Sequence, residues 1–383
     1  MGSKVYRGEP RALFIASRTR SLVNFRGDLV KAMRGAGYGV AAALPLDDGS
    51  LPDAAASLSA LGVLAMPLPM DRAGVNPLSD LPTLLGISRA ILQVRPQVLF
   101  AYTAKPVVYG MLVGWLLRVP RRFALVTGLG YHFTGERRSL AGHVLRMLYR
   151  LALARASIVF FQNPDDEALM RRSGILPARV PSRIVNGSGI NLERFPAVAV
   201  PAHGPVFLMI ARLLGDKGVR EYVAAAAALR AECPAARFQL VGWIDQNPDS
   251  IAREELDAWI AAGSIEFLGK LEDVRPALAS CHVYVLPSYR EGTPRTVLEA
   301  MATGRAVITT DAPGCRETVV DGQNGWLVPV RSVDGLADAM RKFVVEPELA
   351  ARMGARARQI AEERYDVRKV NATMLQAMGM DQG

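Results

Sequence analysis

The stretch VYVLPSYREGTPRTVLEAMATG, residues 283–304, decides the fold. It opens on four apolar residues, Val283–Leu286, passes through a polar turn that contains Gly and Pro, and continues as a helical pattern near Thr296–Thr303. A second apolar run, Ala306–Thr310, follows at once. Strand, turn, helix and strand in this order are typical of an α/β unit with parallel strands.

The same alternation extends outward along the chain in both directions. Further short apolar runs, separated by helical stretches, predict strands at Ala12–Ala16, Tyr38–Leu44, Val63–Pro67, Val98–Tyr102, Phe123–Thr127, Ile158–Gln162, Val206–Ile210, Phe238–Val241 and Ile265–Leu268. Because these runs are almost continuously apolar, we expect parallel sheets covered by helices on both faces. The predicted fold class is therefore α/β, with two doubly wound domains.

The two domains are divided by a segment rich in Pro and Ala, PAVAVPAHGP, at residues 196–205. It lacks both helical and strand periodicity, so we interpret it as a linker and place the domains at residues 1–200 and 201–365. A break in the helical pattern then precedes a last helix at residues 367–378. Open parallel sheets bind ligands at the carboxyl ends of their strands, so functional residues should directly follow the strands, at a cleft that both sheets share.

Composition limits the class of protein. The chain has 383 residues, of which 50% are hydrophobic, and this excludes an intrinsically disordered protein. The formal net charge is +10, and residues 1–200 hold 25 Lys and Arg against 12 Asp and Glu, so the basic surface belongs to the first half. Such a surface attracts anions, which include nucleotides, diphosphates, phospholipid head groups and nucleic acid.

The cysteines and the apolar stretches predict the compartment. Cys233, Cys281 and Cys315 are far apart and odd in number, which gives no support to a disulfide framework or a zinc site. The longest uncharged stretches are shorter than the roughly 20 residues that a membrane-spanning helix requires. The brief apolar run near the start is not typical of a signal peptide. We therefore expect a cytosolic protein without a membrane span.

Two cations follow the strand predicted at residues 206–210. Arg212 and Lys217 lie on one loop, just before the amino terminus of a helix. Both side chains can reach one diphosphate, and the helix dipole would add to the attraction. A solvated charged turn is the alternative interpretation of this spacing alone.

The strongest local pattern lies in the quoted stretch, where Glu291 and Glu299 enclose the turn Gly292-Thr293-Pro294. Carboxylates on either side of a phosphate cradle suit a nucleotide sugar, since one can accept hydrogen bonds from the sugar and the other from the ribose. The spacing alone also fits an ordinary capped helix. The backbone N–H groups expected to point at a phosphate are those at the start of the helix, of Arg295, Thr296 and Val297.

Several motifs together resemble a known enzyme family. Arg212 with Lys217, the Glu-x7-Glu pair within EGTPRTVLEAMATG (291–304) and the later APGCRETVVDGQNGWLV (312–328) look like the retaining glycosyltransferases of family 4. These have the GT-B fold, in which two Rossmann-like domains face a central cleft. Three further motifs resemble the N-acetylgalactosaminyltransferase-like subgroup, which adds an N-acetylhexosamine to an undecaprenyl-diphosphate-linked saccharide: RFALVTGLGY (122–131), GINLERF (189–195) and VGWIDQNP (241–248).

The resemblance implies a role for each candidate residue. Arg212 and Lys217 would hold the donor diphosphate and stabilise the leaving group. Glu291, the third catalytic candidate, would contact the transferred sugar, and Glu299 the ribose. The other residues implied for the nucleotide-sugar site are Gly242, Leu271, Gly292, Thr293, Pro294, Arg295, Thr296 and Val297.

The resemblance also implies a UDP-sugar donor, no metal cofactor, and a last helix, within residues 366–383, that crosses back onto the N-terminal domain. The residues agree about the metal, because the four histidines are scattered and no Asp-x-Asp pair follows a strand. Retention without a metal favours front-face attack, in which the departing phosphate oxygen takes the acceptor proton.

The first domain departs from the commonest pattern of this family. The segment SRTRSLVNFR, residues 17–26, stands after its first strand instead of a Gly-Gly loop. We predict a polar loop over Ser17–Asn24 and expect Asn24 or Arg26 to contribute to the acceptor diphosphate. Lys105 stands where other members have a histidine, although a surface lysine at a helix start is an equal alternative. Gly128 and Gly130 follow another strand and would line the cleft on the acceptor side.

Residues Arg137–Arg155 contain five arginines and no acidic residue, interleaved with apolar residues. This pattern is typical of a basic amphipathic helix that binds an anionic membrane surface. Membrane contact suits a polyprenyl-diphosphate acceptor, which never leaves the bilayer. An ordinary surface helix is the alternative. We expect a peripheral protein at the inner face of the cytoplasmic membrane.

Two other functions remain open. A GT-B enzyme with a soluble sugar acceptor would share the motifs of the second domain and would not need a membrane. A nucleic-acid-binding protein would also be basic, but this chain lacks clustered cations with aromatic side chains for stacking.

Overall fold

The computed structural model describes residues 9–46, 54–70, 80–128, 140–245 and 247–380. Two compact units make up the chain: residues 1–188 with 370–383, and residues 189–369. Each contains one parallel sheet between helices, which confirms the predicted α/β fold class. The division lies before the Pro- and Ala-rich segment because Ile190 and Phe195 are buried in the core of the second unit.

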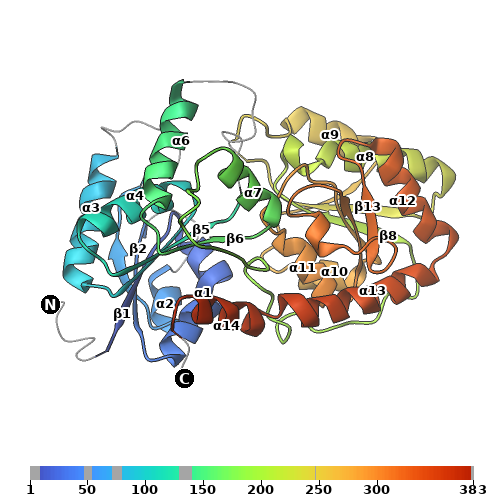
Figure 1. Ribbon diagram of the computed structural model, residues 1–383. Helices are drawn as coiled ribbons and strands as arrows, with labels where there is room; N and C mark the ends of the chain where they lie inside the picture. Colours follow the sequence, from blue (N-terminus) through green and yellow to red (C-terminus); the bar gives the residue numbers. More distant parts are fainter. Residues whose placement is uncertain (1–8, 47–53, 71–79, 129–139, 246, 381–383) are drawn as a thin grey trace. The chain divides into compact units, whose positions relative to one another are not determined.

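The first unit is built on a seven-stranded parallel sheet with the spatial order β3-β2-β1-β4-β5-β6-β7. Strands β1, β2, β5 and β6 of this sheet are labelled in Figure 1. The strands are β1 (Arg11–Ile15), β2 (Gly39–Leu44), β3 (Leu64–Pro67), β4 (Val98–Tyr102), β5 (Arg121–Val126), β6 (Ile158–Phe161) and β7 (Ser182–Ile184). The helices are α1 (Thr19–Gly35), α2 (Ala54–Ala60), α3 (Leu81–Val94), α4 (Ala104–Leu116), α6 (Leu140–Leu153) and α7 (Pro164–Arg172).

Side chains of β1 alternate between the two faces of this sheet, as the period of a strand requires. Leu13 and Ile15 join the buried cluster that includes residues of α3, α4 and α6. Ala12 and Phe14 join the opposite cluster, which includes residues of α1 and α2. Both faces are therefore covered, which explains why the strands read as continuous apolar runs.

Helix α1 begins earlier than the sequence indicates. The stretch from Ser17 to Asn24 was expected to be a loop, but the helix starts at Thr19. Its polar residues have modest helix propensity, yet Leu22, Arg26 and Leu29 lie on one buried face of the helix. Tertiary packing therefore decides this boundary.

The C-terminal residues return to the first unit. Helix α13 (Glu348–Ile360) continues through a π-turn, Ala361–Tyr365, and the chain then forms α14 (Val367–Ala377). Met374 and Met378 are buried in the same cluster as Phe14. Arg121 Nη1 also donates a hydrogen bond to the Met378 carbonyl, at 3.2 Å. The end of the chain thus helps to cover one face of the first unit's sheet.

The second unit is built on a six-stranded parallel sheet with the order β10-β9-β8-β11-β12-β13. The strands are β8 (Val206–Ile210), β9 (Arg237–Val241), β10 (Glu266–Gly269), β11 (Val283–Leu286), β12 (Ala306–Thr310) and β13 (Gly325–Val328). The remaining helices are α8 (Val219–Glu232), α9 (Arg253–Ala261), α10 (Arg275–Ser280), α11 (Arg295–Ala302) and α12 (Val333–Val345).

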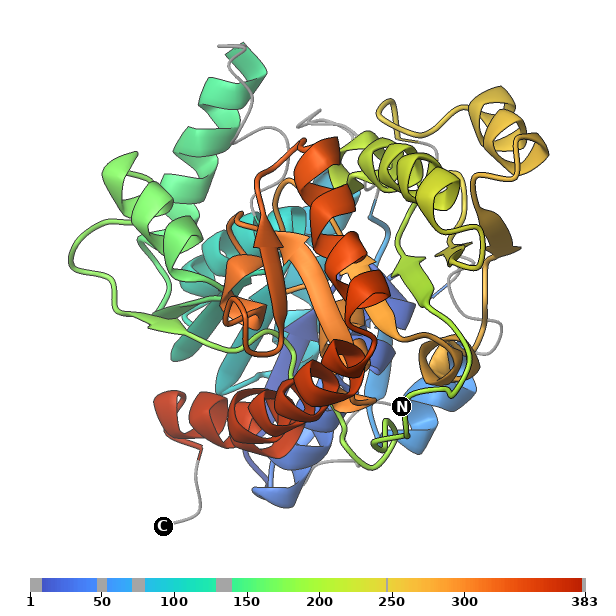
Figure 2. The ribbon, with the colours of Figure 1, turned by 90° about the vertical axis from the view of Figure 1, so that its right-hand side faces the viewer.

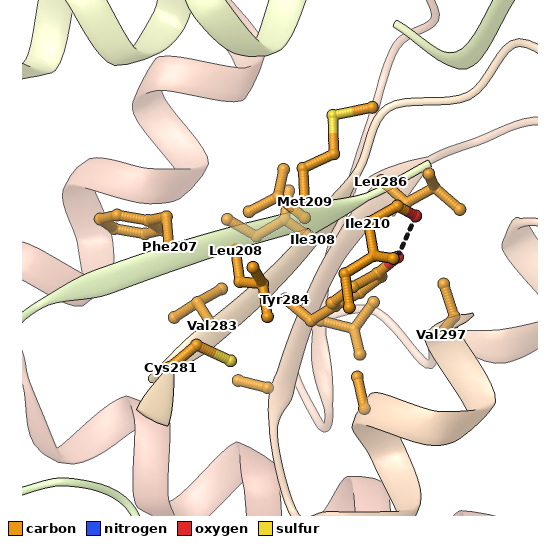
Figure 3. Close-up of a cluster of buried hydrophobic side chains, with 14 of the residues drawn as sticks. Phe207, Leu208, Met209, Ile210, Cys281, Val283, Tyr284, Leu286, Val297 and Ile308 are labelled. Atoms are coloured by element: carbon orange, nitrogen blue, oxygen red, sulfur yellow. Dashed lines mark hydrogen bonds between the residues drawn. The ribbon is translucent and has the colours of Figure 1, made fainter. Parts of the chain in front are cut away.

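Packing in the second unit joins neighbouring strands and helices. Helices α8 and α12 lie side by side (Figure 2). Apolar side chains of β8 and β11 interleave in the core, and the Tyr284 hydroxyl donates to the Ile210 carbonyl at 3.0 Å (Figure 3). This bond satisfies the one polar atom of a fully buried ring. The ends of β8 and β11 are therefore tied together.

Arg305 fixes the Pro- and Ala-rich segment to the second unit. Its guanidinium is fully buried and donates to four backbone carbonyls. Two of these belong to Val198 and Ala199 of the segment, and two to Leu278 and Ala279 of α10, at 2.8–3.2 Å. The segment is thus bonded to its domain and does not behave as a free linker.

Replacement of Arg305 by Met should destabilise the second unit. The change keeps most of the volume but leaves four carbonyls without their donor, at a cost of about 3 kcal/mol. Tm should therefore fall by about 6–12 °C, which differential scanning calorimetry would measure. The matched control is Arg352→Met, an exposed arginine whose loss should shift Tm by less than about 2 °C. Equal shifts for the two variants would contradict the role of Arg305.

Candidate functional site

The carboxyl edge of the second sheet has a crevice at a defined point. After β10 the chain returns to the other side of β8 and forms β11. The neighbours β8 and β11 are therefore followed by connections in opposite directions, from β8 to β9 on one side and from β11 to β12 on the other. Ligands of open α/β sheets bind at such a switch point. Lys217 ends a short 3-10 turn after β8, and Glu291 lies in the loop after β11. The two side chains are therefore at the position where the fold class places a ligand.

Lys217 and Glu291 form an ion pair at this switch point. Lys217 Nζ lies 2.6 Å from Glu291 Oε1, and the two side chains are only 13% and 19% exposed. The Ser288 hydroxyl donates to the same carboxylate oxygen at 2.9 Å. Burial lowers the pKa of Lys217, but the carboxylates of Glu291 and Asp216 outweigh it and raise that pKa above its ordinary value. The ammonium group therefore stays charged at neutral pH.

Arg212 lies on the same loop but in a more open position. Its side chain is 43% exposed, and its Nη1 atom lies 3.1 Å from Asp245 Oδ2. Its positive charge lowers the pKa values of both Lys217 and Asp216, although other effects make the net shift of each upward. The structure thus brings the two predicted cations together. Asp245, Asp216 and Ser288 were not predicted as site residues. Asp216 lies on the same loop as the two cations, and Asp245 and Ser288 lie in the loops after β9 and β11.

The turn before α11 is held by a second loop. The Glu291 N–H donates to the Pro313 carbonyl at 2.9 Å. Gly314 has a φ of +81°, and a Cβ atom there would lie 2.1 Å from the Glu291 carbonyl oxygen. The APGC segment, which entered the sequence analysis only through the family resemblance, therefore needs its glycine to let the two loops approach.

Helix α11 starts directly after Pro294, as its sequence predicts. The Thr296 hydroxyl contacts the buried Tyr284 hydroxyl at 2.6 Å, so this side chain faces the sheet. The Val297 N–H already donates to the Pro294 carbonyl at 3.1 Å. A ligand at the start of this helix would therefore contact mainly the backbone before Val297.

Glu299 belongs to a different group of charges from Glu291. Its Oε1 atom lies 3.1 Å from Arg295 Nε, one helical turn earlier. Burial raises the pKa of Glu299, while Arg295 and the charge of Arg194 lower it, and the net shift is upward. Arg194 comes from the GINLERF segment, so this segment contributes to the surroundings of the second carboxylate.

The loops after β8, β9 and β10 adjoin one another. The Gly242 N–H donates to the Gly269 carbonyl at 3.0 Å, and a Cβ atom on Gly242 would lie 2.1 Å from the Ala211 carbonyl oxygen. Gly242 is therefore required by close backbone packing. The neighbouring Trp243 is partly exposed, with the Lys270 ammonium 5.8 Å from its ring centroid. Leu271 is half-buried against the core.

The first unit places its candidate residues differently from the expectation. Asn24 and Arg26 lie within α1 and not in a loop, and Arg26 is buried with its guanidinium 5.7 Å from the Tyr102 ring centroid. Gly128 follows β5 with a φ of +134°. Gly130 lies outside the described residues.

Lys105 is also not the exposed cation that the sequence suggested. Its Nζ atom lies 2.8 Å from Oδ1 of the buried Asp80, whose other oxygen accepts the Tyr109 hydroxyl at 2.5 Å. Helices α3 and α4 pack together, and the Asp80 carboxylate is buried beside the lysine. Lys105 therefore serves an internal ion pair.

The switch point of the first sheet lies between β1 and β4. Ser17 Oγ and Thr103 Oγ1 meet there at 3.1 Å. Thr103 has a φ of +68°, an unusual conformation for a β-branched residue. The sequence analysis identified neither residue, because backbone strain leaves no signal in the sequence pattern.

Within the described ranges no group of three or more His, Cys, Asp or Glu side chains is arranged to hold a metal ion. Among the helices described, none combines the length and the apolar character needed to span a bilayer.

Two family models match the chain. Residues 23–187 match the glycosyl transferase 4-like domain, and residues 204–345 match the glycosyl transferases group 1. The chain is also 28% identical over 368 residues to N,N'-diacetylbacillosaminyl-diphospho-undecaprenol alpha-1,3-N-acetylgalactosaminyltransferase of Campylobacter jejuni. This similarity spans 92% of the present chain and 94% of that enzyme.

Solved structures agree on the fold. A sucrose-phosphate synthase from Thermosynechococcus elongatus superimposes with a TM-score of 0.78 at 22% identity, over 96% of this chain and 98% of its own. HepE from Anabaena, solved in complex with UDP, gives 0.76 at 19% identity, over 96% and 99%. The chain therefore belongs to the family 4 glycosyltransferases of the GT-B fold, and it is a hexosyltransferase.

Proposed function

We propose that this glycosyltransferase moves an N-acetylhexosamine from a UDP-sugar to a polyprenyl-diphosphate-linked saccharide, with retention and without a metal ion. The observation that carries the proposal is the partly buried Lys217–Glu291 pair at the switch point, with Arg212 on the same loop as Lys217. The name of the Campylobacter relative supports the acceptor and the sugar class. The complex of HepE with UDP supports the nucleotide.

The donor half of the reaction uses the second unit. Arg212 and Lys217 bind the diphosphate and stabilise the negative charge that develops on it as the glycosidic bond breaks. Glu291 accepts hydrogen bonds from the sugar, and Glu299 from the ribose. The acceptor hydroxyl oxygen bonds to the anomeric carbon on the face that the diphosphate leaves. The departing phosphate oxygen takes the hydroxyl proton, so no separate base is needed.

The acceptor half places the first unit at an anionic membrane surface. Helix α6 exposes Val144, Met147 and Leu151, which share one side of the helix at the spacing i, i+3, i+7. Met147 is 64% exposed. Arg150 lies next to this stripe, and Arg146 lies one turn earlier on the flank of the helix. An apolar stripe with a cationic border suits the boundary between lipid tails and acidic head groups. Arg137 and Arg138 lie outside the described residues.

Replacement of Lys217 by Ala should lower turnover by about 100-fold or more. The variant removes a charge-assisted contact that strengthens as the diphosphate departs. Nucleotide release would be measured over a panel of UDP- and GDP-sugars with undecaprenyl-diphosphate-linked acceptors. Lys342→Ala is the control, because Lys342 packs on Trp326 through a cation–π contact and not at this loop. Near-normal activity of the Lys217 variant, with the fold intact, would contradict the assignment of Lys217 to the donor diphosphate.

Activity should persist in excess EDTA. Two cationic side chains and the start of α11 supply the positive charge that a divalent ion would otherwise bring to a diphosphate. The test compares initial rates of nucleotide release in EDTA, in added magnesium and in added manganese. A strict requirement for either ion would contradict metal independence, while leaving the transferase class unaffected.

The protein should bind anionic vesicles through α6, and salt should weaken the binding. Each arginine near such a surface contributes roughly 1 kcal/mol, so the pair Arg146→Glu and Arg150→Glu should reduce co-sedimentation with phosphatidylglycerol vesicles at least tenfold. Met147→Asp should reduce it as well. The control is Val345→Asp, an exposed apolar residue of α12. Equal binding by wild type and the α6 variants, or none by either, would show that α6 is not the docking surface.

A further inference from the structure

The loop after β9 is bonded to the loop that carries Arg212. The Leu213 N–H donates to the Trp243 carbonyl at 3.1 Å. A second bond joins the same two loops, because the Ser250 hydroxyl donates to the Leu213 carbonyl, also at 3.1 Å. The Asp245 N–H in turn donates to Ser250 Oγ at 3.1 Å. These bonds fix the backbone of Asp245 relative to the backbone beside Arg212.

The carboxylate of Asp245 is fixed at both oxygens. Its Oδ1 atom accepts the Asn247 N–H at 3.2 Å, and its Oδ2 atom accepts Arg212 Nη1 at 3.1 Å. The Asp245 side chain is only 24% exposed, whereas Arg212 is 43% exposed. A rigid acceptor therefore holds one edge of a more open guanidinium.

Arg212 and Lys217 lie five residues apart on the same loop. Burial is the largest effect that lowers the pKa of Lys217, and the like charge of Arg212 adds to it, although nearby carboxylates make the net shift upward. Each cation has its own carboxylate partner, Asp245 for Arg212 and Glu291 for Lys217. A planar guanidinium has five N–H donors, so one edge can be held while another binds a phosphate.

We propose that Asp245 is a positioning residue, which orients Arg212 toward the donor diphosphate through the hydrogen bond to Nη1. The inference rests on the proposed function, because it gives Arg212 a diphosphate to bind. A long arginine side chain loses rotamer freedom when it binds a ligand, and prior fixation reduces that loss. Asp245 acts through Arg212 and does not itself touch the substrate.

A double-mutant cycle tests this role. Asp245→Asn keeps the size and an oxygen for the Asn247 N–H but removes the charge that holds Arg212. We expect it to lower kcat about tenfold or more, with the KM for the donor changed less than threefold. In the Arg212→Ala background the same change should alter kcat and the affinity for UDP by less than twofold, since its effect passes through the missing side chain. Asp245→Glu, which keeps the charge, should recover part of the activity.

The control is Asp257→Asn, which breaks an exposed ion pair with Arg253 on α9 and should leave kcat unchanged. UDP affinity from calorimetry gives a second readout if the activity of Arg212→Ala is too low to measure. Equal losses from Asp245→Asn in both backgrounds, or none in either, would overturn the positioning role alone. Wild-type turnover and UDP affinity in Arg212→Ala would overturn the diphosphate assignment, and this inference with it.

Discussion

A partly buried ion pair joins two loops at the switch point of the second unit's sheet and constrains the site around it. Lys217 and Glu291 are 74 residues apart, and they meet because β8 and β11 are neighbours in the strand order. Removing either partner would leave a poorly solvated charge, so the pair constrains both loops. Glu291 also accepts the Ser288 hydroxyl and, through its backbone, bonds to the APGC loop. Glu291 thus joins three loops, its own, the loop of Lys217 and the APGC loop.

Short helix α11 carries one of two charge clusters, which we propose contact different parts of the donor. One contains Glu291 with Lys217 before the helix, and the other contains Glu299 with Arg295 within it. The turn between them is tightly held, because Gly314 is the residue that lets the two neighbouring loops approach. Rigid spacing between the clusters is what recognition of an extended ligand such as a nucleotide sugar requires.

Positive charge in the first unit is used in two different ways. Lys105 forms an ion pair with the buried Asp80, and the Arg26 guanidinium packs over the Tyr102 ring. Arg146 and Arg150, by contrast, lie on α6 next to exposed apolar side chains. Net charge therefore overstates the basic surface that is available to a partner. Only the structure distinguishes charges that hold the fold together from charges that face outward.

The sequence by itself determined every strand described except β7 and β13, together with the loops after them and the Glu291–Glu299 spacing, because apolar runs and turn residues act over a few neighbouring positions. Tertiary structure decided the start of α1, where burial of Leu22 and Arg26 outweighs modest helix propensity. It also decided the ion partners of Lys105 and Arg212. Those pairs join segments far apart in the chain, and their energy depends on distances and burial that exist only after the sheets have formed.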